Sequence, residues 1–315
     1  MDKNLSSIHS FDEDEIDFRE LFQVIWHGKW LITGVVTLFS LVAIIYSLSL
    51  PNIYKSNALL SPMEGQSGMN EALGGYGGIA SLAGINFQSQ SNDSNAVKAI
   101  QKLTTLSFFE KNILPNIYLP DLLAIDSWNS SSNTINYDKD IFDQNTKNWV
   151  RNFKYPQSQI PSAQEAYKVF IKDNIIISKD IDTGFVTISI KHQSPYIAKE
   201  WTELIVDQLN DFFRQKDKAE AQAAVAFLNI QISQTSFAEI KQVIAELIQK
   251  KTQQLTLIEA SKFYVFDYLD TPAVMEQKSE PRRAVICILG AFIGVFFGIL
   301  IILIRHYALN RNAIE

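Results

Sequence analysis

Pairs of carboxylates are the side chains in this sequence that come closest to a catalytic pattern. Asp180 is followed closely by Asp182, and Asp267 is followed closely by Asp270. Two carboxyl groups hydrolyse a glycosidic bond when one acts as the acid and the other as nucleophile or base. Turn and surface roles explain both pairs without catalysis, so we expect none from them. The alternative, a membrane-anchored glycan hydrolase, would cut polymer when purified and would stop doing so when these carboxylates are replaced.

Histidine and cysteine offer no further catalytic constellation. The four histidines, His9, His27, His192 and His306, lie far apart in the sequence, and we expect His192 to be a surface residue at a strand end. The single cysteine, Cys287, excludes an internal disulfide. The sequence also lacks the phosphate-binding, zinc-protease and nucleophile-elbow motifs. We therefore expect no catalytic residue, no cofactor-binding residue and no metal site, and hence no enzyme.

A glycine-rich segment, Gly74 to Phe87, contains a partial dinucleotide-binding pattern. Gly75, Gly77 and Ala80 fit G-x-G-x-x-A, but no apolar strand precedes them and no acidic residue follows about 20 positions later, as such a site requires. The segment is better explained as a loop of small residues that permits close packing.

Two long apolar segments set the organisation of the chain. Leu31 to about Leu50 and Ala284 to Ile304 contain no charged residue, and each is long enough to cross a hydrocarbon core of about 30 Å. A water-soluble protein would have to bury two helices that are apolar on every face. The first segment follows an acidic stretch and is too long for a signal peptide, so we expect it to remain as an anchor.

Two membrane spans place both ends of the sequence on one side. The predicted organisation is a cytoplasmic tail with an interfacial helix (1–29), a first transmembrane helix (30–50), a periplasmic domain (51–283), a second transmembrane helix (284–304) and a cytoplasmic tail (305–315). The sequence has 28 basic and 34 acidic residues and no long basic run, which argues against nucleic-acid binding.

The central region mixes strand and helix patterns. Ile175 to Lys179 and Phe185 to Lys191 alternate as a β-hairpin, and Phe263 to Leu269 is typical of a strand. Ser162 and Glu165 form the S-x-x-E capping box that opens a helix. The pattern predicts an α+β domain.

A very long helix is predicted after the hairpin, because no Gly or Pro occurs from Tyr196 to Thr271. One helix over about 196–261 would be roughly 100 Å long. An αα-hairpin with a break near Gln215 to Lys218 is the alternative. We expect the apolar stripe of the helix to pack against neighbouring copies. The stripe consists of Trp201, Leu204, Leu209, Val225, Leu228 and Ile232.

Small residues recur along the second apolar segment. Gly290, Gly294 and Gly298 form a doubled G-x-x-x-G face, which lets helix backbones approach closely in lipid. We expect this face to serve helix packing and oligomerisation. Pro272 and Pro281 bracket a polar connector just before it.

Together these features resemble the Wzz-type polysaccharide co-polymerases, which are O-antigen chain-length determinants. The resemblance rests on DEIDFRELFQVIWHGKWLI (Asp14 to Ile32), NIYKSNALLSP (Asn52 to Pro62), PSAQEAYKVF (Pro161 to Phe170), and Pro272 and Pro281 before a glycine-spaced span. The proline segment before that span is thinner here than in the family.

The resemblance implies a fold and a function. The fold is two transmembrane helices around a periplasmic α+β domain with a small mixed β-sheet base and a very long protruding α-helix. The function is non-enzymatic control of lipopolysaccharide O-antigen length in the Gram-negative inner membrane. The implied partners are other copies of the chain in a homo-oligomer, a Wzy-type polymerase, lipid-linked polysaccharide and membrane lipid.

Other functions fit parts of the sequence. The segment from Gly74 to Phe87 also resembles co-polymerases for capsule or exopolysaccharide, which work with a separate cytoplasmic tyrosine kinase. We expect no fused kinase, because about eleven residues follow Ile304. A two-span sensor shares the layout of two spans around one domain, but neither tail of this sequence is long enough for an output domain.

Overall fold

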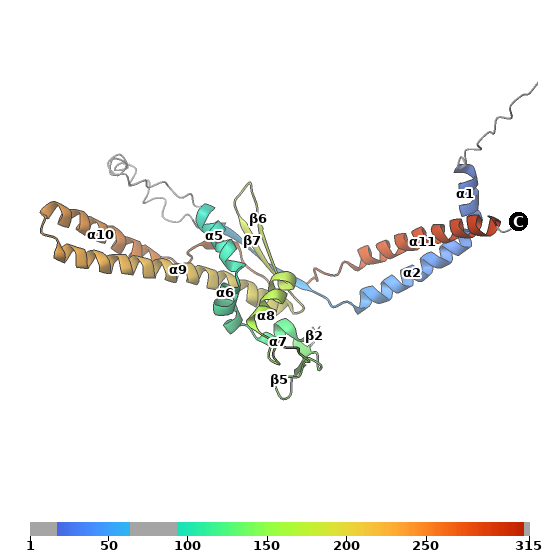
Figure 1. The fold of residues 1–315 in the computed structure, drawn as a ribbon, viewed down its shortest axis with the longest axis horizontal. Coiled ribbons are helices and arrows are strands. Elements are labelled where there is room, and N and C mark those ends of the chain that lie inside the picture. The colour runs from blue at the N-terminus through green and yellow to red at the C-terminus, as the bar shows by residue number, and fades with distance from the viewer. Residues whose placement is uncertain (1–17, 64–92, 312–315) are drawn as a thin grey trace, which may run out of the picture. The chain divides into compact units, whose positions relative to one another are not determined.

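The computed structural model describes residues 18–63 and 93–311. These residues form two compact units, one within 1–51 and 280–315 and the other spanning 52–279, and each is described by itself (Figure 1). The glycine-rich segment with Gly75, Gly77 and Ala80 lies outside the described residues, as does His9.

The first unit contains an amphipathic helix and two long apolar helices among its described residues. Helix α1 (Phe18–His27) precedes α2 (Lys29–Ser49), and α2 lies beside α11 (Arg283–Arg311). An 18-residue window within Lys29–Ser49 has a mean hydropathy of 2.3 and one within Arg283–His306 has 3.0, so both helices are long and apolar enough to cross a membrane. Two helices therefore form where the two uncharged segments predict them.

A four-stranded sheet forms the base of the second unit. Its strand order is β6 (Ile175–Lys179), β7 (Val186–His192), β1 (Tyr54–Pro62) and β8 (Phe266–Asp270). The predicted hairpin is confirmed, because β6 pairs with β7 in antiparallel register.

The sheet is antiparallel throughout rather than mixed. Strands β7 and β8 each pair antiparallel with β1, so the two run in the same direction but are separated by β1. The helical connection between β7 and β8 therefore does not bring parallel neighbours together, which is the arrangement that a mixed sheet would need.

One face of the sheet packs against the first turns of a long helix, α9 (Pro195–Gln234). Alternate residues of β7 face inward, because successive side chains of a strand point to opposite faces. Burying each large apolar side chain stabilises the fold by about 1.5–3 kcal/mol. The fully buried residues of this layer are Ala58, Leu60, Val186, Ile188, Ile190, Ile205 and Leu209.

The expected single helix over 196–261 is instead a hairpin of two helices. Helix α9 ends at Gln234, and α10 (Ala238–Ala260) runs back along it (Figure 1). The Lys218 ammonium lies 2.7 Å from the Glu259 carboxylate, as expected for an antiparallel return. The alternative of an αα-hairpin is correct, but the break is not near 215–218, where α9 continues without interruption.

The break occurs without glycine or proline. Thr235 and Phe237 adopt extended backbone angles (φ −88°, ψ 141° and φ −82°, ψ 124°), which any L-residue can adopt. The return buries Ala221, Ile244 and Ile258 between the helices. Packing of the two helices, rather than a helix-breaking residue, decides where the chain turns.

A buried asparagine connects the hairpin to the sheet. The Asn210 Oδ1 atom accepts hydrogen bonds from the backbone N–H groups of Tyr264 (3.2 Å), Val265 (2.8 Å) and Phe266 (3.0 Å). Its Nδ2 atom donates to the Phe266 carbonyl at 3.0 Å. These bonds fix the chain where it leaves α10 and enters β8.

A smaller aromatic cluster forms beside the main core. Phe142 and Trp149 pack at 5.3 Å between ring centroids, and Ala124 is buried with them. The elements around it are α7 (Leu119–Leu123), β2 (Ile125–Asn129), β3 (Thr134–Tyr137), β4 (Phe142–Asp143) and β5 (Asn148–Trp149). The remaining segments are α5 (Asp93–Leu103), α6 (Leu106–Phe108), η1 (Phe109–Ile113), η2 (Leu114–Asn116), α8 (Ala163–Val169) and η3 (Phe170–Asn174).

Candidate functional site

The three glycines of α11 all face α2 of the same chain. A Cβ atom at Gly290 would lie 2.4 Å from the Ala43 Cβ, and one at Gly294 would lie 2.9 Å from the Val36 Cα. At Gly298 it would lie 3.2 Å from the Ile32 Cα. Backbones this close leave no room for a larger side chain. Part of the expected oligomerisation face is thus occupied within the chain, and a role in contacts between copies stays a prediction.

A fourth glycine contacts α11 and was not singled out from the sequence. Gly28 lies between α1 and α2, and a Cβ there would lie 2.1 Å from the Ile302 Cδ1. The only signal in the sequence is an isolated glycine between two helical patterns, which does not reveal its neighbour.

The predicted stripe of the long helix is covered by its own chain. Trp201 is 3% exposed and Leu209 is fully buried, and Leu204 packs against the same core. Further along α9, Val225, Leu228 and Ile232 are half-buried in the hairpin. The base of the domain thus covers the start of the stripe and α10 covers the rest in part, so packing of the stripe against neighbouring copies stays a prediction.

A different face of the hairpin remains apolar and exposed. Phe227, Ile230 and Phe237 are 60%, 55% and 67% exposed. No charged residue occurs between Glu220 and Glu239. Large exposed apolar patches usually mark interaction sites. We call this surface the exposed hairpin face; it comprises Phe227, Ile230, Phe237, Ile240, Val243 and Leu247.

The sequence did not single out Phe227, Ile230 and Phe237 because they are interleaved with the stripe, whereas Ile240, Val243 and Leu247 continue its period. Phe227 and Ile230 are adjacent to Leu228 and Ile232 in sequence, so a single long helix has too wide an apolar surface to assign. Only the position of α10 shows which residues are covered.

The proline connector runs along the start of β1. Pro272 is buried, and the neighbouring Ala273 carbonyl accepts a hydrogen bond from the Ser56 hydroxyl at 3.0 Å. The Ser279 N–H donates to the Ile53 carbonyl at 2.8 Å. Pro281 belongs to the unit of apolar helices.

His192 is buried rather than on the surface. The Ser194 N–H donates to its Nδ1 at 2.9 Å, so its Nε2–H donates to the Asp121 carbonyl at 3.0 Å. The ring packs edge-on against Trp201 with the centroids 5.1 Å apart. Burial lowers the pKa of His192 to about 4, so the ring is held neutral as a structural residue.

The carboxylate pairs lie in turn and strand positions. Asp180 Oδ1 accepts from the backbone N–H groups of Asp182 (2.8 Å) and Thr183 (3.2 Å), which lowers the pKa of Asp180 and closes the turn. Asp267 and Asp270 lie on β8. Within the described ranges, no group of three or more His, Cys, Asp or Glu side chains is arranged to hold a metal ion.

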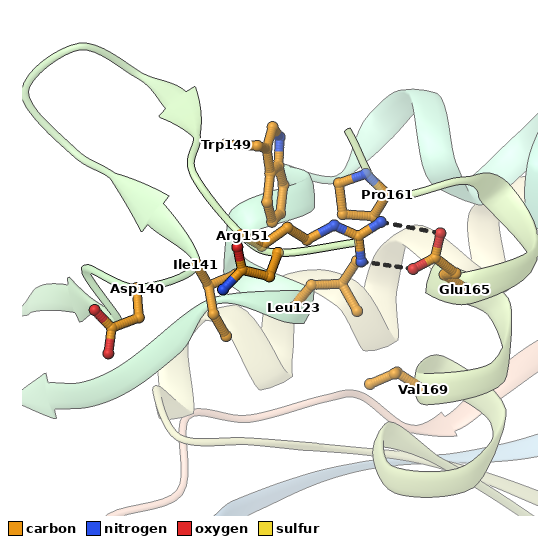
Figure 2. Close-up of a pocket in the computed structure, with 9 residues that line it drawn as sticks. Leu123, Asp140, Ile141, Trp149, Arg151, Pro161, Glu165 and Val169 are labelled. Carbon is orange, nitrogen blue, oxygen red and sulfur yellow. Dashed lines mark hydrogen bonds and ion pairs between the residues drawn. The ribbon is translucent and has the colours of Figure 1, made fainter. Parts of the chain in front are cut away.

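A cavity of about 380 Å³ lies between the aromatic cluster and α8 (Figure 2). The Arg151 guanidinium forms a double ion pair with Glu165, at 2.5 Å and 3.1 Å. Glu165 also accepts from the Ser162 N–H at 3.2 Å in the predicted capping box, which is confirmed. Hydrogen bonds from Arg151 are the main reason why the pKa of Glu165 is lowered.

Comparisons with known proteins give one family match. Residues 14–113 match the family model described as chain length determinant protein, Wzz. This match confirms the resemblance proposed from the sequence. No curated protein matches the chain.

The chain is also similar to two solved structures. One is described as a full-length bacterial polysaccharide co-polymerase, with 15% identity, a TM-score of 0.41, and coverage of 94% of this chain and 100% of that one. The other is a fragment of WzzB, a polysaccharide co-polymerase from Salmonella Typhimurium, with 10% identity, a TM-score of 0.32, and coverage of 73% and 100%.

Proposed function

We propose that this chain, whose residues 14–113 match the Wzz chain length determinant family, sets the length of lipopolysaccharide O-antigen as a co-polymerase. In this proposal it carries out no catalysis and acts as a homo-oligomer with a Wzy-type polymerase on lipid-linked polysaccharide. The family match is the observation that carries the proposal. The turn positions of Asp180 and Asp182 support a role without hydrolysis.

In the proposed topology, α2 and α11 cross the Gram-negative inner membrane. Both are long and apolar enough, and they pack through the glycine face of α11. Two crossings put both tails on one side, which we assign to the cytoplasm, with residues 51–283 in the periplasm and the proline connector next to the membrane.

The exposed hairpin face is the surface that we assign to contacts between copies. Its part around Phe227, Ile230 and Phe237 lies between Glu220 and Glu239, where no charged residue occurs, so these parts of two faces can meet without burying an unpaired charge. Its side chains extend along α9 and α10, which suits side-by-side packing of hairpins.

The proposed mechanism is geometric. An assembly of hairpins has fixed dimensions, and these dimensions determine how long the polymerase retains a growing chain before release. Changes in packing between copies should therefore change the glycan length distribution without changing the sugar composition.

The first experiment compares the lipopolysaccharide length ladder of a deletion strain with that of the complemented strain. Loss of a modal cluster on deletion and its return on complementation is the expected result. An unaltered ladder would overturn the O-antigen assignment. A change in capsule or exopolysaccharide length instead would favour the adaptor version, whose partner is a separate tyrosine kinase.

A second experiment tests the assembly surface. The double change Phe227→Ser and Phe237→Ser should reduce oligomer size, measured by cross-linking and light scattering of the full-length protein in detergent. It should also broaden the ladder, since contacts between copies are weakened. Gln234→Ser, at an exposed polar position of the same hairpin, is the matched control. Unchanged oligomer size in the double variant would refute the assignment.

A further inference from the structure

The loop over residues 150–161 presents unusually exposed apolar side chains. Tyr155 is 96% exposed, Ile160 is 64% exposed and Phe153 is 50% exposed. Folding gains nothing from rings left in water, so exposed aromatic residues that cluster in one loop indicate a binding surface.

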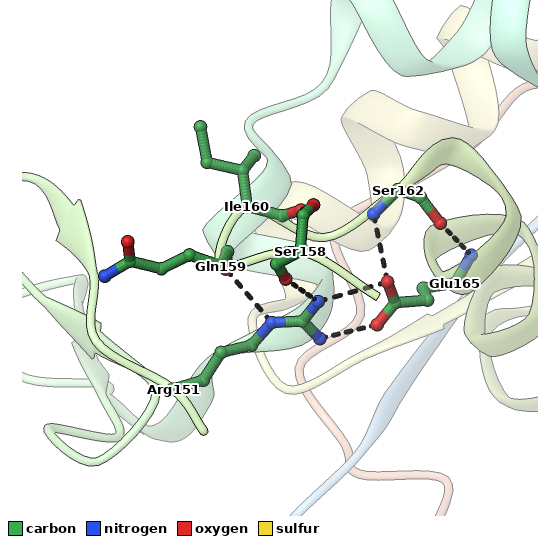
Figure 3. A network of polar contacts seen from close by, with 6 residues as sticks. All are labelled: Arg151, Ser158, Gln159, Ile160, Ser162 and Glu165. Atoms are coloured by element: carbon green, nitrogen blue, oxygen red, sulfur yellow. Dashed lines mark hydrogen bonds and ion pairs between the residues drawn. The ribbon is translucent and has the colours of Figure 1, made fainter. Parts of the chain in front are cut away.

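The base of this loop is held in place. Arg151 Nη2 donates to the Ser158 carbonyl at 2.7 Å, and Nε donates to the Gln159 carbonyl at 3.0 Å (Figure 3). Gln159 Nε2 donates to the Trp149 carbonyl at 2.6 Å. Because its two ends are tied together and to α8 through Glu165, the loop presents its rings at little ordering cost on binding.

The cavity of about 380 Å³ borders the same loop. Figure 2 shows Trp149 and Pro161 above the Arg151 guanidinium, and Leu123 and Val169 on the other side. Asp140 and Asn152 add a carboxylate and an amide to the lining. An apolar cavity with a few polar groups is the usual composition of a site for a small ligand unit.

The charge of the cavity narrows the ligand class. Arg151 and Glu165 neutralise each other, and Arg151 already donates four hydrogen bonds to Glu165, Ser158 and Gln159. Asp140 then leaves the lining with a net negative charge, which disfavours phosphate or other anions. A neutral ligand with apolar faces and several hydroxyl groups fits a lining of rings, a carboxylate and an amide.

We propose that the cavity and loop 150–161 bind neutral sugar units of the glycan. Phe153 and Tyr155, in the loop but outside the cavity lining, provide flat apolar surfaces for the C–H faces of sugar rings. In the lining, Asp140 accepts hydrogen bonds from hydroxyl groups, and the Asn152 amide both donates and accepts them. The choice of a glycan rests on the proposed function, because it names the substrate class of that function.

The test measures binding of the full-length protein in detergent micelles to polysaccharide released by mild acid from the lipopolysaccharide of the parent strain. Isothermal titration is performed with the unsubstituted protein, with Phe153→Ala combined with Tyr155→Ala, and with Asp140→Asn. The double variant should bind about tenfold more weakly or worse. Asp140→Asn keeps the size of the side chain and should weaken binding severalfold. Ile181→Ala, at a position that is 93% exposed on the turn after β6, is the control and should bind normally.

Each outcome decides the proposal. Weaker binding by the loop variants, with unchanged thermal unfolding and oligomer size, supports the site. Equal binding by all variants, or no binding by the unsubstituted protein, overturns it. Loop variants that lose association with the polymerase but bind glycan normally make the loop a protein interface and also overturn it. The length ladder of the deletion strain separately tests the proposed function, so the site can fail while length control stands.

Discussion

Replacing Asn210 with alanine removes four hydrogen bonds at the junction between the helical hairpin and the sheet. Three of them satisfy backbone N–H groups at residues 264–266, and Val265 and Phe266 are 5% and 0% exposed. Water therefore cannot replace the lost partner without opening the core. At about 1 kcal/mol for each hydrogen bond, we expect the free energy of unfolding to fall by about 4 kcal/mol.

The assay is thermal unfolding of the full-length protein in detergent, followed by near-ultraviolet circular dichroism. For a unit of this size, a loss of about 4 kcal/mol lowers Tm by about 8–16 °C. Asn229→Ala is the matched control, because Asn229 is an exposed asparagine on the same helix. The control should change the free energy of unfolding by at most about 0.5 kcal/mol.

The reasoning is refuted if Asn210→Ala and Asn229→Ala unfold at the same temperature. That result would mean that the backbone of residues 264–266 finds other partners, and that contacts other than those of Asn210 attach the hairpin to the sheet.

Three further predictions concern the packing of α11 on α2, the buried His192, and the ion pair of Arg151 with Glu165. Gly294→Leu should loosen the packing of α11 on α2 and broaden the length distribution of the glycan. Gly34→Leu is the control and should change neither, because nothing lies within 4 Å of a Cβ at Gly34. The same length ladder in both variants would contradict this prediction. Between about pH 6.5 and pH 4, His192 is protonated in the unfolded chain but neutral in the folded one. The free energy of unfolding should therefore fall by about 1.4 kcal/mol for each unit by which the pH is lowered in this window. Denaturation of the His192→Gln variant should lack this contribution to the pH dependence. Arg151→Met should lower the free energy of unfolding by about 2–3 kcal/mol at neutral pH. Arg151 lowers the pKa of its partner Glu165, so the ion pair stabilises the fold above the ordinary carboxyl pKa and this stabilisation is lost as the pH falls through the lowered one. The stability of the variant should therefore approach that of the unsubstituted protein at low pH. A difference in the free energy of unfolding that does not depend on pH would argue against the ion pair as its cause.

Local patterns in the sequence identified several elements correctly. The capping box of Ser162 and Glu165 and the hairpin of β6 and β7 depend on neighbours a few residues apart, so their geometry follows from short-range hydrogen bonds. The ion pair between Arg151 and Glu165 joins residues 14 positions apart, and no sequence pattern predicts it.

Burial of His192 shows why single residues are harder to assign. A histidine at a strand end is usually exposed, but the Asp121 carbonyl that receives its Nε2–H comes from a segment 71 residues earlier. Only the packing of α7 near the end of β7 creates that contact.

The sequence by itself determined the two uncharged helices and the α+β character of the region between them, because length, charge and periodicity act within one element. The tertiary structure decided which apolar residues are covered. The turn at 235–237 folds α10 back on α9 without any glycine or proline, so Val225 and Leu228 are half-buried while Phe227 and Phe237 stay exposed. The glycine face of α11 could likewise pack against any helix in lipid. Only the tertiary structure shows that it packs against α2 of the same chain. Contacts between elements depend on distances that no local pattern encodes.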